Sequence, residues 1–149
     1  MELRYLIIHS TKTKEGKNIV VGDIISSHQD KGFSNVGYSD IIDIDGNILS
    51  LTKHNTSGRC LDWLLGKEID NYSRHIAYTG GINKSSTYLK DTRTDSQKET
   101  LEIYVKYMIR RHSNIIVAGH NQFNNKSCPG FNVPEWLHEI GVEDKNIYR

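Results

Sequence analysis

Two histidines and one cysteine are the residues of this chain whose types and positions could hold a catalytic metal ion. His120 follows the apolar run 115–118, and Cys128 closes the polar loop that comes next. His9 follows a second apolar run, residues 6–8, in the same way. Two imidazoles and one thiolate are ligands that suit zinc, with the fourth position left for water. If the three side chains meet in space, the chain is a metal-dependent hydrolase.

Each of these three residues also has an ordinary interpretation. A single histidine after a strand is often a hydrogen-bonded structural residue, and a cysteine before a proline is often an inert buried thiol. The chain has two cysteines, Cys60 and Cys128, too few for a scaffold held by several disulfides. One bridge between them is an alternative to metal binding by Cys128, and Cys60 is otherwise expected to be a buried thiol.

The two histidines converge only if the elements that precede them are neighbours in the fold. Residues 3–8 and 114–118 are short and apolar with β-branched side chains, which predicts two buried strands. A strand end fixes the backbone while the side chain faces a cleft. If these strands are adjacent, we expect His9 and His120 to lie together, with Cys128 brought back by the intervening loop.

The rest of the chain predicts strands interleaved with helices. Asp45-Gly46 between two apolar-rich runs predicts a hairpin, and Thr94 followed by Gln97 predicts a capping box at a helix start. The segment 60–65 fits either a short helix or a buried turn. Expected helices cover 21–31, 94–112 and 134–140, and further strands cover 36–44, 47–51 and 75–79. This order predicts a single α/β domain over residues 1–149, with a central mixed sheet flanked by helices.

Composition and charge exclude several classes of protein. The 149 residues, 36% hydrophobic and 25% charged, suit one soluble globular domain. The net charge is +1 and no basic stripe is present, so no nucleic-acid partner is expected. No segment is apolar enough for membrane insertion, and the first residues do not resemble a signal peptide. We therefore expect synthesis in the cytoplasm, with separate delivery if the substrate lies outside the membrane.

Short motifs in one fixed order extend from residue 3 to about residue 136. They are IIHSTKT (7–13), GY (37–38), YTGG (78–81), DTRTDSQ (91–97), GH (119–120) and KSCP (126–129). In type and order they resemble the N-acetylmuramoyl-L-alanine amidases of the type 2 family. This family includes phage lysozyme-type amidases, and peptidoglycan recognition proteins are its relatives. The resemblance implies the fold shared by these amidases and recognition proteins.

The resemblance also implies site residues and an activity. A zinc ion would be held by His9, His120 and Cys128, while Tyr38 and Lys126 would act on the substrate. The implied reaction is hydrolysis of the amide bond between N-acetylmuramic acid and L-alanine in peptidoglycan. Binding-only relatives often lack the cysteine ligand, so the presence of Cys128 favours catalysis.

The chain departs from the family pattern beside the metal ligands. Family members usually have a histidine after the tyrosine, where this chain has Ser39, and a Gly-x-His element where residues 61–69 have no histidine. His28 and His54 are candidates for groove contacts, while His75 and His138 lie in no motif. The alternative function is therefore a peptidoglycan- or muropeptide-binding module with impaired catalysis. A metal-free fold with coincidental motifs is a third option.

The biological setting has two interpretations at this level. A small amidase of this kind suits a phage endolysin that is released to the cell wall. It equally suits an antibacterial effector, which would require an immunity protein as partner. In both cases we expect a monomer that acts on the wall after release or delivery.

Overall fold

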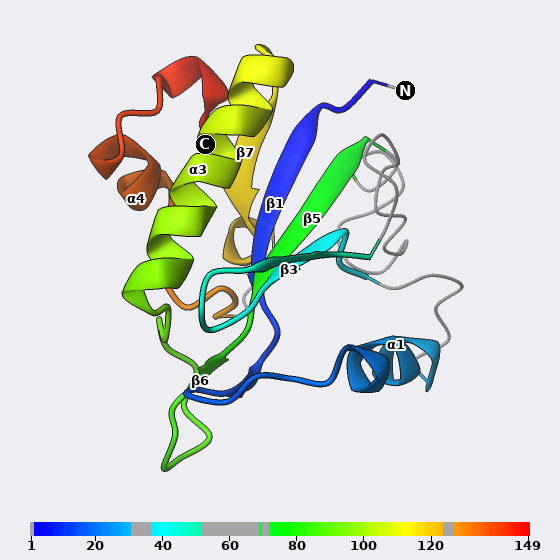
Figure 1. Ribbon diagram of the computed structural model, residues 1–149. Coiled ribbons are helices and arrows are strands. Elements are labelled where there is room, and N and C mark those ends of the chain that lie inside the picture. Colours follow the sequence, from blue (N-terminus) through cyan, green and yellow to red (C-terminus); the bar gives the residue numbers. More distant parts are fainter. Residues whose placement is uncertain (1, 31–36, 52–68, 70–71, 124–126) are drawn as a thin grey trace.

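The computed structural model describes residues 2–30, 37–51, 69, 72–123 and 127–149. Its centre is a five-stranded mixed sheet in the order β4-β3-β5-β1-β7, flanked by helices (Figure 1). Three neighbouring pairs are parallel, and only β3 and β4 run antiparallel. The strands are β1 (Tyr5–Ser10), β3 (Asp40–Ile42), β4 (Ile48–Ser50), β5 (Ser73–Tyr78) and β7 (Ile116–Gly119). The predicted mixed sheet is confirmed.

Strand β1 is the middle of the parallel part of the sheet. It pairs with β5 on one side and with β7 on the other, so the two apolar runs that precede His9 and His120 are neighbours. Nearly every residue of β1 and β5 is buried, which explains the continuous apolar character of the β1 run. The sequence placed His9 just after this strand, whereas the structure includes it as the fifth residue of β1.

Side chains along these strands alternate between two faces of the sheet. Leu6 and Ile8 of β1 belong to the main apolar core, together with Ile76 and Tyr78 of β5. The alternate residues of β1, Ile7 and His9, therefore point to the opposite face. The period of two thus separates an apolar face from the face that carries the predicted metal ligands.

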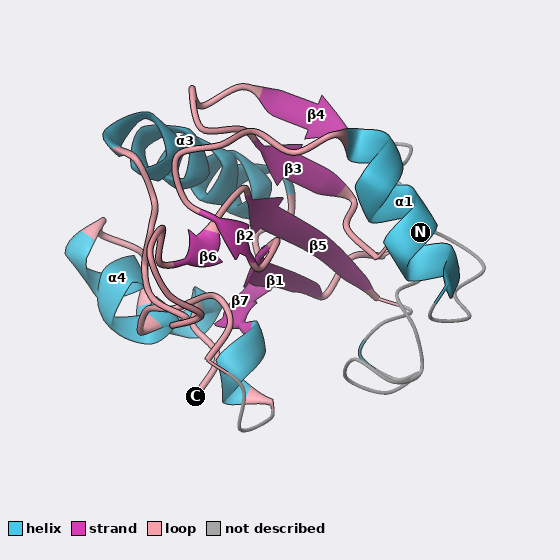
Figure 2. Ribbon diagram, turned by 90° about the horizontal axis from the view of Figure 1, so that it is seen from below, coloured by secondary structure: helices cyan, strands magenta, loops and turns pink. Residues whose placement is uncertain are grey.

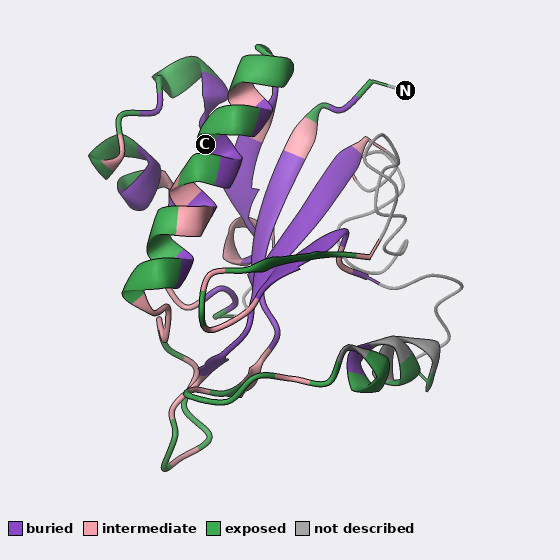
Figure 3. Cartoon of the chain, viewed as in Figure 1, coloured by how far each residue is buried: buried purple, intermediate pink, exposed green. Residues whose placement is uncertain are grey.

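Helices α3 (Asp95–Arg111) and α4 (Val133–Glu139) supply the other half of the core. Leu101, Val105 and Met108 of α3 pack into the core, while the outer side of the helix is exposed (Figure 3). The predicted capping box is present, since Gln97 N–H donates to the Thr94 hydroxyl and the Gln97 side chain accepts from Thr94 N–H. The helices predicted over residues 94–112 and 134–140 are therefore confirmed.

The predicted hairpin joins β3 to β4. The Asp43 carboxylate accepts hydrogen bonds from the backbone N–H groups of Asp45 and Asn47, and Gly46 has a φ of 88°. A side chain at Gly46 would also lie 2.8 Å from the Thr100 hydroxyl of α3, so the turn needs glycine for two reasons. The hairpin therefore packs directly against α3.

Smaller elements complete the described chain. Helix α1 (Val21–Asp30) lies on the opposite side of the molecule from α3 and α4 (Figure 2). Strands β2 (Thr13–Lys14) and β6 (Gly81–Ile82) form a separate two-stranded sheet, and short 3₁₀ helices follow β7 and α4. In the described segments no helix has the length and apolarity needed to cross a membrane. Cys60 and the uncertain segment 60–65 lie outside the described residues.

Candidate metal centre

The two histidines meet because β1 and β7 are parallel neighbours. The last registered pair is Ile8 with Gly119, so His9 and His120 continue the two strands side by side. Their ring centroids are 4.8 Å apart, and both residues are buried. Because the carboxyl ends of parallel strands share one edge of the sheet, this convergence is the one expected from the sequence.

Cys128 reaches the same point from the loop between β7 and α4. The backbone N–H of Ser10 in β1 donates to its sulfur at 3.2 Å. A donor at the sulfur suits a thiolate ligand, because ligand atoms need partners that orient them. The cysteine is buried, as are the two histidines.

The loop that carries Cys128 is held from the other side of the sheet. Tyr78 of β5 donates its hydroxyl hydrogen to the carbonyl of Pro129 at 2.7 Å. Gly130 has a φ of 93°, and a side chain there would collide with the carbonyl of Lys90. The loop is therefore packed tightly against a neighbouring segment, which fixes the position of the thiol.

These three residues form a group able to hold a metal ion. Their ligand atoms all lie within 4.8 Å of one another, and all three residues are buried. Two imidazoles and a thiolate form the donor set of catalytic zinc sites, which keep a fourth position open. Among the described residues this is the one group of three or more His, Cys, Asp or Glu side chains placed to hold a metal ion. The donor set therefore fits zinc.

His75, which lies in no motif, is also part of this centre. Its Nδ1 lies 2.8 Å from Nε2 of His9, and the residue is completely buried in β5. His9 pairs with Ala77 of β5. Because side chains two residues apart in a strand share a face, His75 lies on the same face as His9. Its place beside His9 depends on the register of β1 against β5, which the sequence does not display.

Ser39, the departure from the family pattern, lies directly beside His75. The Ser39 N–H donates to the His75 carbonyl at 2.7 Å, and the His75 N–H donates to the Ser39 hydroxyl at 3.2 Å. Ser39 thus fixes the backbone of His75 on both sides. The position following the tyrosine is thus connected to the candidate metal centre through His75.

Tyr38 lies at the border of the site. Its hydroxyl donates to the carbonyl of Ser10 at 3.3 Å, and its ring centroid is 5.4 Å from that of His9. It is partly exposed, unlike the three candidate ligands. The predicted residues Lys126, His54 and 61–68 lie outside the described residues, as does the side chain of His28. His138 is exposed and contacts Asp144 at 3.0 Å, away from the site.

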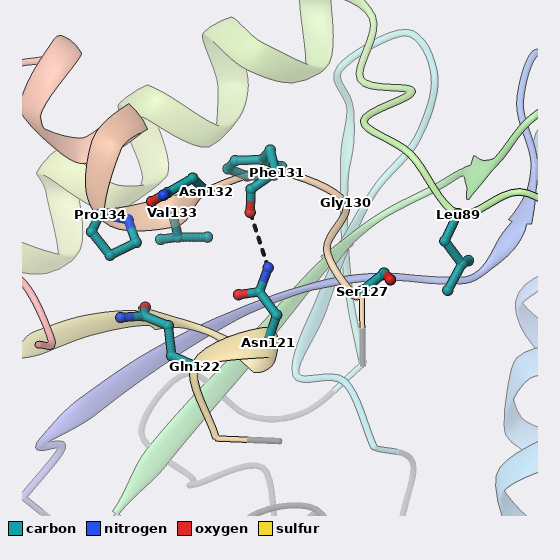
Figure 4. Close-up of a pocket in the computed structure, with 9 residues that line it drawn as sticks. All are labelled: Leu89, Asn121, Gln122, Ser127, Gly130, Phe131, Asn132, Val133 and Pro134. Atoms are coloured by element: carbon teal, nitrogen blue, oxygen red, sulfur yellow. Dashed lines mark hydrogen bonds between the residues drawn. The ribbon is translucent and has the colours of Figure 1, made fainter. Parts of the chain in front are cut away.

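A pocket of about 620 Å³ lies next to the ligand loops (Figure 4). Segments that follow His120 and that flank Cys128 form its walls. The Asn121 amide bridges these two segments by donating to the carbonyl of Phe131 at 3.1 Å. The lining residues are Leu89, Asn121, Gln122, Ser127, Gly130, Phe131, Asn132, Val133 and Pro134.

A second buried polar cluster occupies the core face of the sheet. Arg74 donates to the Asp40 carboxylate at 2.8 Å, and the Tyr104 hydroxyl of α3 donates to the same oxygen at 2.5 Å. Ser50 donates to the other carboxylate oxygen at 2.7 Å. Burial and the neighbouring Asp40 carboxylate raise the pKa of Tyr104 above its ordinary value, which keeps the phenol protonated. The sequence did not predict this cluster.

Fold and site together define an α/β protein with a three-residue candidate metal centre at the carboxyl edge of its parallel strands. The chain belongs to the N-acetylmuramoyl-L-alanine amidase family, whose model matches residues 1–131. The endolysin of Escherichia phage T7 is 23% identical to it over 134 residues, which cover 88% of this chain and 83% of the endolysin.

Solved structures show the same fold. The N-acetylmuramoyl-L-alanine amidase LysC from Clostridium intestinale URNW has a TM-score of 0.73 and 23% identity, covering 96% of this chain and 88% of LysC. A complex of peptidoglycan recognition proteins LCa and LCx with tracheal cytotoxin has a TM-score of 0.65 and 15% identity, covering 99% of this chain and 86% of that one. The amidase and peptidoglycan recognition protein fold implied by the motifs is thus confirmed.

Proposed function

We propose that this protein is a zinc-dependent amidase that hydrolyses the bond between N-acetylmuramic acid and L-alanine in peptidoglycan. The observation that carries the proposal is the buried group of His9, His120 and Cys128 at one edge of the sheet. Membership of the amidase family supplies the substrate class. Relatives named endolysin support a lytic role at the cell wall.

The protein's own residues divide the work of this reaction. Bound zinc would lower the pKa of its water to about 7 and polarise the scissile carbonyl. His9, His120 and Cys128 would hold the ion, with the Ser10 N–H orienting the sulfur. The Tyr38 hydroxyl, already at the border of the site, would donate to the oxygen that becomes negative. The cation of Lys126, which lies outside the described residues, would stabilise the same oxygen.

The setting we propose is that of a phage endolysin, acting as a monomer on the wall after release from the cytoplasm where it is made. The similarity to phage endolysins favours this setting over an antibacterial effector with an immunity protein.

The experiment that tests the activity is digestion of purified peptidoglycan with the zinc-loaded protein. Mass spectrometry should find new free L-alanine amino groups and lactyl carboxylates. The Cys128→Ala variant should produce none, and Tyr107→Phe, on the partly exposed side of α3, should match the wild type. A wild-type protein that binds zinc but releases no such ends would refute the proposed activity.

A second function, binding of peptidoglycan or muropeptide without turnover, is favoured by Ser39 at the departure from the family pattern and by the shared fold of peptidoglycan recognition proteins. Equal muropeptide affinity in the wild type and Cys128→Ser, with no cleavage by either, would establish it in place of the amidase.

A further inference from the structure

We propose that His75 is a positioning residue of the metal centre, which accepts a hydrogen bond from Nε2–H of His9 and commits His9 to bind the metal through Nδ1. This inference rests on the proposed metal-dependent function. It adds a residue that lies in none of the motifs and that comes from a strand with no ligand of its own.

The distance between the two rings identifies the contact. His9 Nε2 and His75 Nδ1 are 2.8 Å apart, which is the length of a hydrogen bond. Two nitrogens bound to one zinc ion at about 2.0–2.1 Å in a tetrahedral arrangement would lie roughly 3.3 Å apart. The two atoms therefore share a proton rather than an ion, and His75 is not a fourth ligand through this nitrogen.

The direction of the hydrogen bond follows from the chemistry of a ligand. A histidine binds zinc as a neutral imidazole, with one nitrogen on the ion and the proton on the other. When Nδ1 of His9 is the ligand, its Nε2 carries the proton and donates it to His75. The Nδ1 of His75 then accepts, and its own proton lies on Nε2. Such a partner fixes the orientation and the tautomer of the ligand.

The surroundings of His75 are built to hold its ring in one place. The residue is completely buried in the middle of β5, and Ser39, directly before β3, hydrogen-bonds both its N–H and its carbonyl. On the other side β5 pairs with β1, the strand of His9. Since both backbones are fixed by the sheet, the separation of the two rings is fixed as well.

Two variants separate positioning from simple packing. His75→Asn keeps an acceptor oxygen near the place of Nδ1, whereas His75→Leu fills similar space without an acceptor. Zinc affinity is measured by competition with a chromophoric chelator, and the cobalt-substituted proteins give an absorption spectrum that reports ligand geometry. Loss of such a partner commonly weakens metal binding about 10–100-fold. We expect that loss in His75→Leu, with a changed cobalt spectrum, and recovery of affinity to within about threefold of wild type in His75→Asn.

A stability control belongs in the same series. Val105→Ala on α3 removes core contacts on the opposite face of the sheet, so it lowers stability without touching the site. It should leave zinc affinity and the cobalt spectrum unchanged. Unchanged affinity in folded His75→Leu would overturn the inference, and so would an equal loss in His75→Leu and His75→Asn.

A measurement on the unaltered protein tests the inference even if a variant fails to fold. Long-range ¹H–¹⁵N spectra of the zinc-loaded protein assign the protonated nitrogen of each histidine ring. We expect the proton on Nε2 in both His9 and His75; zinc on Nε2 of His9 would overturn the inference. A wild type without zinc affinity would instead remove the proposed function itself, which keeps the two failures distinct.

Discussion

Two buried polar clusters lie on opposite faces of the same strands, and they are built for different ends. Arg74 and His75 are consecutive in β5, yet Arg74 joins Asp40 and Tyr104 under α3 while His75 joins His9 at the candidate metal centre. In the first cluster a cation faces a carboxylate, so the buried charges compensate each other. In the second, the ligand atoms of His9, His120 and Cys128 converge on one point, which suits the binding of a metal cation.

The two arrangements suit different roles: the ion pair suits a structural role, and the group of ligand atoms suits metal binding. A buried ion pair is destabilising to break, because one charge is left without compensation. A group of ligand atoms contributes through the ion that it binds. Stability and zinc affinity measured on the same variants separate these two roles.

The largest effect is expected from Cys128→Ser in the ligand cluster. An alcohol is a much poorer zinc ligand than a thiolate, so zinc affinity should fall by at least about a thousandfold, and hydrolysis with it. Chelator competition measures the affinity, and urea unfolding of the metal-free protein should differ from wild type by only about 1 kcal/mol. Retained stoichiometric zinc binding would show that Cys128 is not a ligand.

The ion-pair cluster should give the opposite result. Arg74→Met leaves the Asp40 carboxylate buried without its cation, so the free energy of unfolding should fall by about 3–5 kcal/mol. Zinc affinity of the folded fraction should stay within a few-fold of wild type. The double variant with Asp40→Leu should recover part of the stability, because no buried charge then remains. If Arg74→Met is as stable as the wild type, the ion pair between Arg74 and Asp40 does not stabilise the fold.

The two clusters also differ in how well the sequence predicted them. His9 and His120 follow apolar runs, and parallel strands bring their carboxyl ends to one edge, so local patterns were enough. His75 lies 66 residues from His9, and Tyr104 lies 64 residues from Asp40. Both contacts depend on strand register or helix placement, which short-range periodicity does not contain. The hairpin at Asp45-Gly46 was predictable because its signal lies within a few residues of the chain.

Tyr78 belongs to the apolar core and donates a hydrogen bond to the loop of Cys128. Its ionisation should lower the free energy of unfolding at alkaline pH. Burial raises its pKa to about 12, from 10 in the unfolded chain, so the folded state holds the proton more tightly. This contribution to stability is complete below pH 10 and is lost as the pH rises through 12. Between pH 9 and pH 11 the wild type should therefore lose about 1.3 kcal/mol more than Tyr78→Phe. Urea unfolding of metal-free protein measures this, and equal losses in both would contradict it.

The smallest effect tests whether the core face can be weakened without disturbing the ligands. Thr94→Ala removes the hydroxyl that accepts from Gln97 N–H at the start of α3, the helix that carries Tyr104. Loss of such a cap should lower the free energy of unfolding by about 1 kcal/mol. Zinc affinity should not change, because the ligands lie on β1, after β7 and in the following loop. Thr94→Ser, which keeps the acceptor, is the matched control. A parallel loss of zinc affinity in Thr94→Ala would mean that the two faces are coupled through the sheet, so that the core-face cluster also supports the candidate ligands.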